Sequence, residues 1–118
     1  MESEYIAMSM AMKQWIPLRR TVIAICEALE LSEDLTSTIK SEVWEDNAGA
    51  LALAKLEPPR MTPRSKHYSI KYHWFRDFIK SDNIELNKID TKVQLADILT
   101  KSLPKDQFVI LRKMLMGW

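Results

Sequence analysis

The sequence predicts an α/β fold: one domain over residues 1–118, with two parallel strands packed with about six helices. Apolar residues recur at helical spacing over most of the chain, and two short segments carry the pattern of strands. Helices separate these two segments, which permits parallel pairing. A sheet of only two strands is inadequate on its own, since independently stable sheets usually have more strands.

The first third of the chain is predicted to be helical. Over residues 2–14 the apolar residues fall on one helical face, namely Tyr5, Met8, Met12 and the adjoining Trp15. Pro17 removes a backbone donor, so we expect either a kink or a second helix that begins there. The apolar stripe of that second part is Leu18, Val22, Ile25 and Leu29. Residues 32–37 are mostly polar and predict a loop.

The middle of the chain predicts a strand, a short helix and a longer helix. The β-branched content of residues 38–46 favours a strand that ends at Asp46, and the alanine-rich residues 47–56 favour a helix. Asp46 would then lie at the carboxyl end of a strand, where open α/β sheets place their sites. Three prolines indicate a loop over 58–63, and Ser65 is a plausible cap for a helix over 66–80.

The last third predicts a strand followed by two helices. Asp82 and Asn83 mark a turn, and residues 84–87 alternate between apolar and polar as a half-buried strand does. Thr91 and Gln94 form a capping-box signature, so a helix is expected from there to about Ser102. Asp97 would lie roughly two turns inside it. Pro104 opens the last helix.

Composition excludes several classes of protein. The 17 Lys and Arg residues nearly balance the 16 Asp and Glu residues, which does not indicate a globally basic nucleic-acid binder. The single Cys26 can form neither an internal disulfide nor a cysteine-rich zinc site. This favours an intracellular location, cytoplasmic or nuclear. No segment approaches the length of a membrane span, so no membrane partner is expected.

Three acidic residues are the candidates for chemistry: Glu2, Asp46 and Asp97. Carboxylate oxygens suit Mg²⁺, and two such ions can activate water and stabilise the leaving oxygen in phosphodiester hydrolysis. Acidic residues scattered along a sequence are usually solvated surface residues. The pattern alone therefore does not establish a metal site.

Four segments together match a known family: ESEYIA at 2–7, EDNAGAL at 45–51, RSKHYSIKYHWFR at 64–76 and DTKVQLADILTKSLP at 90–104. In these segments, in their order and in their spacing, the chain resembles the C-terminal ribonuclease H domain of copia-type retrotransposon Pol polyproteins. The resemblance covers essentially the whole chain. It implies a ribonuclease H-like fold and endonucleolytic hydrolysis of the RNA strand of RNA–DNA hybrids with two Mg²⁺ ions.

The resemblance also implies roles for the three acids. Glu2, Asp46 and Asp97 would be the catalytic metal ligands, carried by the first helix, the end of a core strand and the last core helix. Glu4 is the nearest competitor of Glu2, which is favoured because it precedes the small Ser3.

The resemblance further implies that the fold lacks its first three strands, because in the family these precede the glutamate helix and carry another catalytic aspartate. We therefore expect weak or absent Mg²⁺ binding and little activity for this chain alone. The expected partners are the missing strands, the reverse transcriptase portion of the polyprotein, or a second copy that pairs through the exposed sheet edge.

A basic stretch is the expected contact with an RNA–DNA hybrid: Arg64, Lys66, His67, Lys71, His73 and Arg76. The same stretch also fits an amphipathic helix with a solvated basic face. Asn47 either contacts the nucleic acid or caps the helix that follows it. A competing interpretation of the whole chain is a noncatalytic nucleic-acid-binding or interaction module left from a degenerate retroelement.

Overall fold

The computed structural model describes residues 2–31, 33–34, 39–57, 60 and 72–118. The elements in chain order are α1 (Glu2–Ala28), β1 (Ser41–Glu45), α3 (Ala48–Lys55), the 3₁₀ helix η2 (Trp74–Asp77), α4 (Phe78–Ser81), β2 (Ile84–Lys88), the 3₁₀ helix η3 (Thr91–Val93), α5 (Asp97–Thr100) and α6 (Lys105–Met116). The strands β1 and β2 pair in parallel, with Ser41 opposite Ile84 and Glu45 opposite Lys88. The predicted α/β class and the parallel pairing are confirmed.

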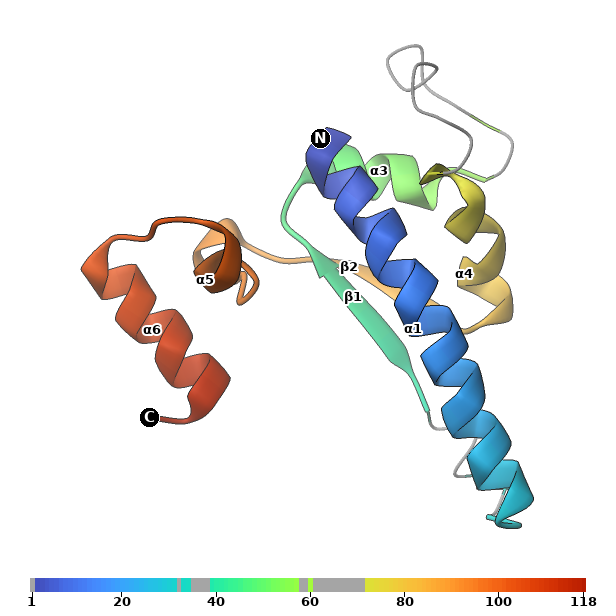
Figure 1. The fold of residues 1–118 in the computed structure, drawn as a ribbon. Helices are drawn as coiled ribbons and strands as arrows, with labels where there is room; N and C mark the ends of the chain where they lie inside the picture. Colours follow the sequence, from blue (N-terminus) through green and yellow to red (C-terminus); the bar gives the residue numbers. More distant parts are fainter. Residues whose placement is uncertain (1, 32, 35–38, 58–59, 61–71) are drawn as a thin grey trace.

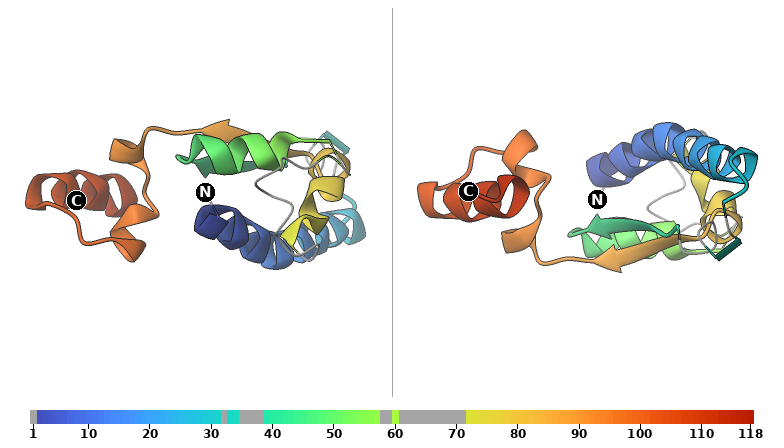
Figure 2. Two further views of the ribbon diagram at one scale, coloured as in Figure 1. Left: turned by 90° about the horizontal axis from the view of Figure 1, so that it is seen from above. Right: turned by 90° about the horizontal axis from the view of Figure 1, so that it is seen from below.

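The helices gather on two sides of the strands. Helices α1, α3 and α4 lie on one side, and α5 and α6 stand apart on the other (Figure 1). Views turned by 90° show α1 and the strands as two layers (Figure 2). The molecule measures 48 × 44 × 18 Å, so it is flat rather than spherical.

The core lies where α1 meets α3, η2 and β2. Helix α1 buries one face, on which Tyr5 and Met12 are almost fully enclosed. The opposing apolar side chains are Ala50, Leu51, Leu53, Ala54, Phe75, Ile84 and Leu86. Each fully buried large apolar side chain stabilises the fold by about 1.5–3 kcal/mol, so this cluster fixes α1 relative to α3 and β2.

Helix α1 continues through Pro17 as one element. Ile16 and Arg19 on either side of the proline are buried, and the Arg19 guanidinium donates to the Asp82 carbonyl and, over 3.1 Å, to the Ile39 carbonyl. Arg20 adds an ion pair with the Asp82 carboxylate at 2.8 Å. These contacts hold the second half of α1 against the turn before β2, which offsets the hydrogen bond that Pro17 cannot make.

The second half of α1 differs from the sequence prediction, since no separate helix begins at Pro17. The stripe of Leu18, Val22, Ile25 and Leu29 is exposed, at 41–66% of each residue's surface. The contacts here are made instead by the buried Arg19 and the exposed Arg20. Among the described residues, no helix is both long enough and apolar enough to cross a membrane.

Two predicted helices are not continuous α-helices in the described residues. Of the helix expected over 66–80, residues 66–71 lie outside the described residues, and the remainder is η2 followed by the four-residue α4. The helix expected from Thr91 to Ser102 is divided into η3 and α5. Its capping box does not form, because the Gln94 side chain donates to the Trp44 carbonyl, 50 residues away in sequence, over 3.0 Å.

A buried hydrogen bond joins the first turns of α1 to the segment before η2. The Tyr5 hydroxyl lies 2.9 Å from His73 Nδ1, and burial raises the pKa of the Tyr5 phenol to about 12. This bond fixes the end of α1 that carries the candidate acids.

We expect Tyr5→Phe to lower the free energy of unfolding by about 1–2 kcal/mol, because it removes a buried hydrogen bond and leaves the shape of the ring intact. Urea unfolding of the two proteins measures the difference. Equal stability would show that the Tyr5–His73 bond contributes nothing net to the attachment of α1.

Candidate functional site

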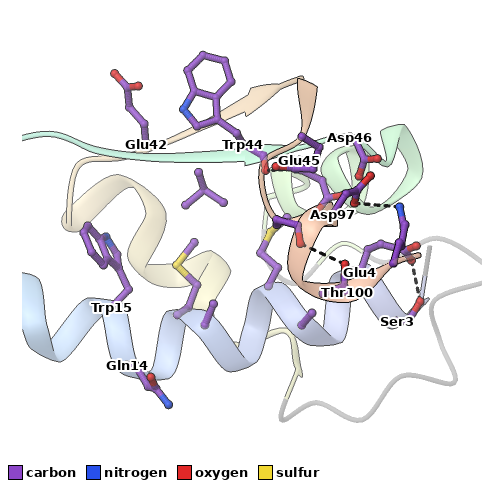
Figure 3. Close-up of a pocket in the computed structure, with 18 of the residues that line it drawn as sticks. Ser3, Glu4, Gln14, Trp15, Glu42, Trp44, Glu45, Asp46, Asp97 and Thr100 are labelled. Carbon is purple, nitrogen blue, oxygen red and sulfur yellow. Dashed lines mark hydrogen bonds and ion pairs between the residues drawn. The ribbon is translucent and has the colours of Figure 1, made fainter. Parts of the chain in front are cut away.

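A cleft of about 920 Å³ separates α1 from β1, and the segment that carries α5 borders it at one end (Figure 3). Helix α1 contributes a stripe of lining residues from Ser3 to Leu18, and residues 42–46 contribute the opposite wall. Acidic side chains gather near one end of the cleft, where Glu4, Asp46 and Asp97 lie together.

The helical face of α1 decides which N-terminal glutamate lines the cleft. Glu4, Ala7, Ala11 and Leu18 all line it, as expected for positions about one turn apart. Glu2 is exposed and is not among the lining residues. Side chains two positions apart in a helix point about 200° apart, so Glu2 points away from the direction in which Glu4 points. The sequence favoured Glu2 over Glu4 as the acid of this site. In the structure it is Glu4 that lines the cleft.

The carboxyl end of β1 supplies two more acids. Glu45 ends the strand and Asp46 follows it, and both line the cleft. Glu45 Oε1 accepts from the Asn47 N–H over 2.8 Å. Burial is the main cause that raises the pKa of Glu45 above its usual 4.5, and the nearby charges of Asp46 and Glu4 act in the same direction. These carboxylates therefore repel one another across the end of the cleft.

Asn47 is the N-cap of α3. Its side-chain oxygen accepts from the Ala50 N–H over 3.0 Å, which satisfies one of the free donors at the start of the helix. Of the two roles that the sequence left open, the capping role is confirmed.

Asp97 is the first residue of α5, rather than lying two turns inside a helix. Its side chain is only 6% exposed, and its Oδ1 atom pairs with Lys101 Nζ at 3.0 Å. The hydrogen bond to Asp97 is the main cause that raises the pKa of Lys101, and the negative charges of Asp97, Asp46 and Glu4 add to it. Lys101 therefore lies within the field of all three acids.

The acids as placed do not form a ligand set for Mg²⁺. Within the ranges that the structure describes, no group of three or more His, Cys, Asp and Glu side chains lies close enough together to hold a metal ion. Asp97 is engaged by Lys101, and Glu4 accepts from the Ser3 hydroxyl over 2.9 Å. The structure thus brings Glu4, Asp46 and Asp97 to one cleft without bringing their oxygens to one ion.

Within the part of the chain that the structure describes, the wall of the cleft formed by β1 is a free sheet edge. The Glu45 carbonyl accepts from the Ile89 N–H over 3.2 Å, so the backbone groups of Glu45 face β2. Because these groups alternate in direction along a strand, those of Glu42 and Trp44 face away from β2. There the Trp44 carbonyl accepts from the Gln94 amide, which occupies the position that the N–H of a neighbouring strand would take.

The predicted contacts with nucleic acid are placed only in part. His73 and Arg76 are each 5% exposed and so do not belong to an exposed basic surface. His73 bonds to Tyr5, and Arg76 donates to the Arg60 carbonyl over 2.7 Å. The other four basic residues, Arg64, Lys66, His67 and Lys71, lie outside the described residues.

Comparison with known proteins finds relatives among plant transposons. The chain is 29% identical over 113 residues, 96% of its length, to the retrovirus-related Pol polyprotein from transposon TNT 1-94 of Nicotiana tabacum. It is 36% and 35% identical over 66 residues, 56% of its length, to the corresponding polyproteins from transposons RE1 and RE2 of Arabidopsis thaliana. These similarities support a region derived from a retrotransposon Pol polyprotein.

The matched region is a small part of each relative. It spans 8% of the tobacco polyprotein and 4% of each Arabidopsis polyprotein. No protein-family model matches the chain. No solved structure matches it either.

The burial of Glu45 and the nearby charges of Asp46 and Glu4 predict a pH-dependent gain from Glu45→Gln. A carboxyl group whose pKa is raised in the folded state stabilises the fold below its unfolded pKa, and this stability is lost as pH rises through the folded pKa. Above about pH 4.5 the ionised Glu45 thus destabilises the fold. We expect Glu45→Gln to raise the free energy of unfolding at pH 7, by less than about 1 kcal/mol because solvent screens a half-exposed group.

At pH 3.5 the same substitution should change little, because both forms are then neutral. Urea unfolding at the two pH values measures the difference, and the matched control is Glu42→Gln, an exposed glutamate on the same strand. Equal effects of the two substitutions at pH 7 would contradict a specific repulsion at Glu45.

Proposed function

We propose that this chain is part of a ribonuclease H-like nuclease domain of a retrotransposon polyprotein, which hydrolyses the RNA strand of RNA–DNA hybrids when complete. The observation that carries the proposal is the position of Glu4, Asp46 and Asp97 on one cleft, each from a different element. The sequence resemblance and the similarity to plant Pol polyproteins support it.

The proposed cofactor is Mg²⁺, which suits carboxylate ligands and would supply charge stabilisation and an activated water when bound. The three acids need a further group to form its ligand set, since no such set exists among the described residues. We propose that a strand bearing another carboxylate pairs with the free edge of β1 and completes the site. The isolated chain is then inactive or nearly so.

The free edge of β1 supports this requirement for another strand. Parallel sheets are normally covered on both faces and paired on both sides of their inner strands. Here the Trp44 carbonyl on one side of β1 accepts from the Gln94 amide, no second strand pairs there among the described residues, and Trp44 is 48% exposed. The alternative function, a noncatalytic nucleic-acid-binding module, depends on residues 64–71, which lie outside the described part of the chain, and it stays a prediction.

The proposal predicts that completion of the sheet restores activity. We would fuse the chain to the segment that precedes the matched region in the tobacco polyprotein and measure Mg²⁺-dependent cleavage of a labelled RNA–DNA hybrid. The fusion should cleave, and Asp46→Asn should slow it by about 100-fold or more, because it removes a ligand rather than a supporting group. Glu42→Gln, which removes an acid that points away from α1 (Figure 3), is the matched control.

Cleavage by the fusion at the same rate with and without Asp46→Asn would refute the site. Absence of cleavage by a folded fusion would refute the nuclease function. Robust cleavage by the 118-residue chain that Asp46→Asn abolishes would support the site and refute the need for a further strand.

The same fusion decides between the two N-terminal glutamates. We expect Glu4→Gln to reduce cleavage by about the same factor as Asp46→Asn, because Glu4 lines the cleft. Glu2→Gln should leave the rate within about twofold, because Glu2 lies on another face of α1. The opposite result would return the ligand role to Glu2.

A further inference from the structure

The outer edge of β1 presents backbone groups to which no second strand pairs in the part of the chain that the structure describes. These groups belong to Glu42 and Trp44, whose side chains are exposed and point away from α1 (Figure 3). The Trp44 carbonyl accepts from the Gln94 amide, which is a side chain and not a strand. A row of outward backbone groups is a template on which another strand can pair.

Apolar surface lies beside this edge. Trp15 and Leu18 of α1 line the cleft and are 41% and 54% exposed, and Val22 and Ile25 continue the exposed stripe along the helix. Exposed apolar surface of this kind marks a site of interaction. A partner that pairs with β1 and brings a helix of its own to the same face can cover part of it, which adds apolar burial to the backbone hydrogen bonds.

The charges around β1 fit a second copy of the same chain. Two copies of β1 can pair antiparallel about a twofold axis, and the register then decides which side chains lie opposite one another. A pairing centred on Val43 places Lys40 opposite Asp46 of the second copy. It places Glu42 opposite Trp44, so no two acids face each other. Opposite charges therefore meet at both ends of the paired segment, which stabilises the pairing.

The neighbouring registers are disfavoured by charge. A pairing centred on Glu42 places the two glutamates directly opposite each other. A pairing centred on Trp44 places Glu42 opposite Asp46 of the second copy. Like charges directly opposite each other destabilise a sheet. Registers between these do not bring the outward backbone groups of the two strands together.

We propose that two copies of this chain form a dimer through β1, in the register centred on Val43, with a continuous sheet in the order β2, β1, β1, β2. Four strands are a common sheet size, whereas two strands alone are marginal. The Trp44 carbonyl then accepts from the Glu42 N–H of the second copy in place of the Gln94 amide. No described residue after Leu86 belongs to the apolar core cluster, so the segment from Gln94 onward can shift without opening the core.

The dimer needs neither metal nor nucleic acid and does not depend on the proposed nuclease function. It uses the edge that a further strand takes in the complete domain proposed above, so it describes the chain on its own.

The first test places a disulfide at the twofold axis. In this register the two Val43 residues form a non-hydrogen-bonded pair with Cα atoms about 4.5 Å apart, which a disulfide can span. Val43→Cys in a Cys26→Ser background should form a cross-linked dimer under mild oxidation, seen on a nonreducing gel. The matched control is Trp44→Cys in the same background. The two copies of that residue are diagonal neighbours about 7–8 Å apart, so cross-linking should be at least about tenfold slower.

The second test reverses the charges and measures the dimer Kd by sedimentation. Lys40→Asp and Asp46→Lys should each weaken the dimer roughly tenfold, because each puts like charges opposite each other at both ends of the paired segment. The double variant restores opposite charges and should return the Kd to within about twofold of the unmodified chain. Lys105→Asp changes an exposed lysine of α6 and should leave the Kd unchanged. Circular dichroism verifies that each variant is folded.

A chain that sediments as a monomer up to the millimolar range would overturn the proposal. A dimer in which Trp44→Cys cross-links as fast as Val43→Cys would also overturn it, because the copies would then meet in another register or elsewhere. A double variant no tighter than the single variants would refute the pairing of Lys40 with Asp46. The cleavage assay can fail while the dimer forms, and a nuclease can be active in a chain that stays monomeric, so the two proposals are tested separately.

Discussion

The width of the cleft depends on how α1 is fastened to the rest of the molecule. The Tyr5–His73 hydrogen bond holds one end of the helix, and the pair of Arg20 with Asp82 holds the other. Between them, apolar side chains of α1 form one cluster with those of α3, η2 and β2, and Val43 of β1 packs against this cluster. Helix α1 and the strands lie as two layers (Figure 2), and the cleft that the acids line lies between α1 and β1.

Charge in the cleft follows from that separation. If α1 packed directly on β1, the acids of the two elements would have to be neutral or paired to be buried. Because water reaches the cleft, Glu4 and Asp46 can remain there, while the more deeply buried Asp97 takes Lys101 as its partner. Burial is the main cause that raises the pKa of Glu45 in the same cleft, and the charges of Asp46 and Glu4 add to it.

The sequence predicted the parts of the site that depend on local patterns. The end of β1 near Asp46 follows from the β-branched run before it, and the cap at Asn47 follows from the alanine-rich helix after it. Lys101 could have been found by its spacing of four residues from Asp97. Glu4 could have been preferred to Glu2 by extending the face of Ala7 and Ala11 backward by one turn.

The parts that could not be predicted depend on contacts between distant residues. The capping box at Thr91 and Gln94 satisfied a local rule, but the Trp44 carbonyl on an unpaired strand competes for the same amide. The second half of α1 has the apolar stripe of a buried helix, yet its stripe stays exposed because arginines make the long-range contacts. Rules based on neighbouring residues cannot say whether a side chain will bond locally or to a residue far away in the sequence.

The Gln94 amide links the free edge of β1 to the charges of the cleft. A strand that pairs with β1 would provide an N–H for the Trp44 carbonyl and so release Gln94. Gln94 lies three residues before Asp97, and the Asp97 N–H bonds to the Gln94 carbonyl over 3.2 Å. Release of Gln94 would therefore loosen the segment that holds Asp97 against Lys101. In the proposed complete domain, pairing at the edge of β1 would therefore act on the segment that carries Asp97.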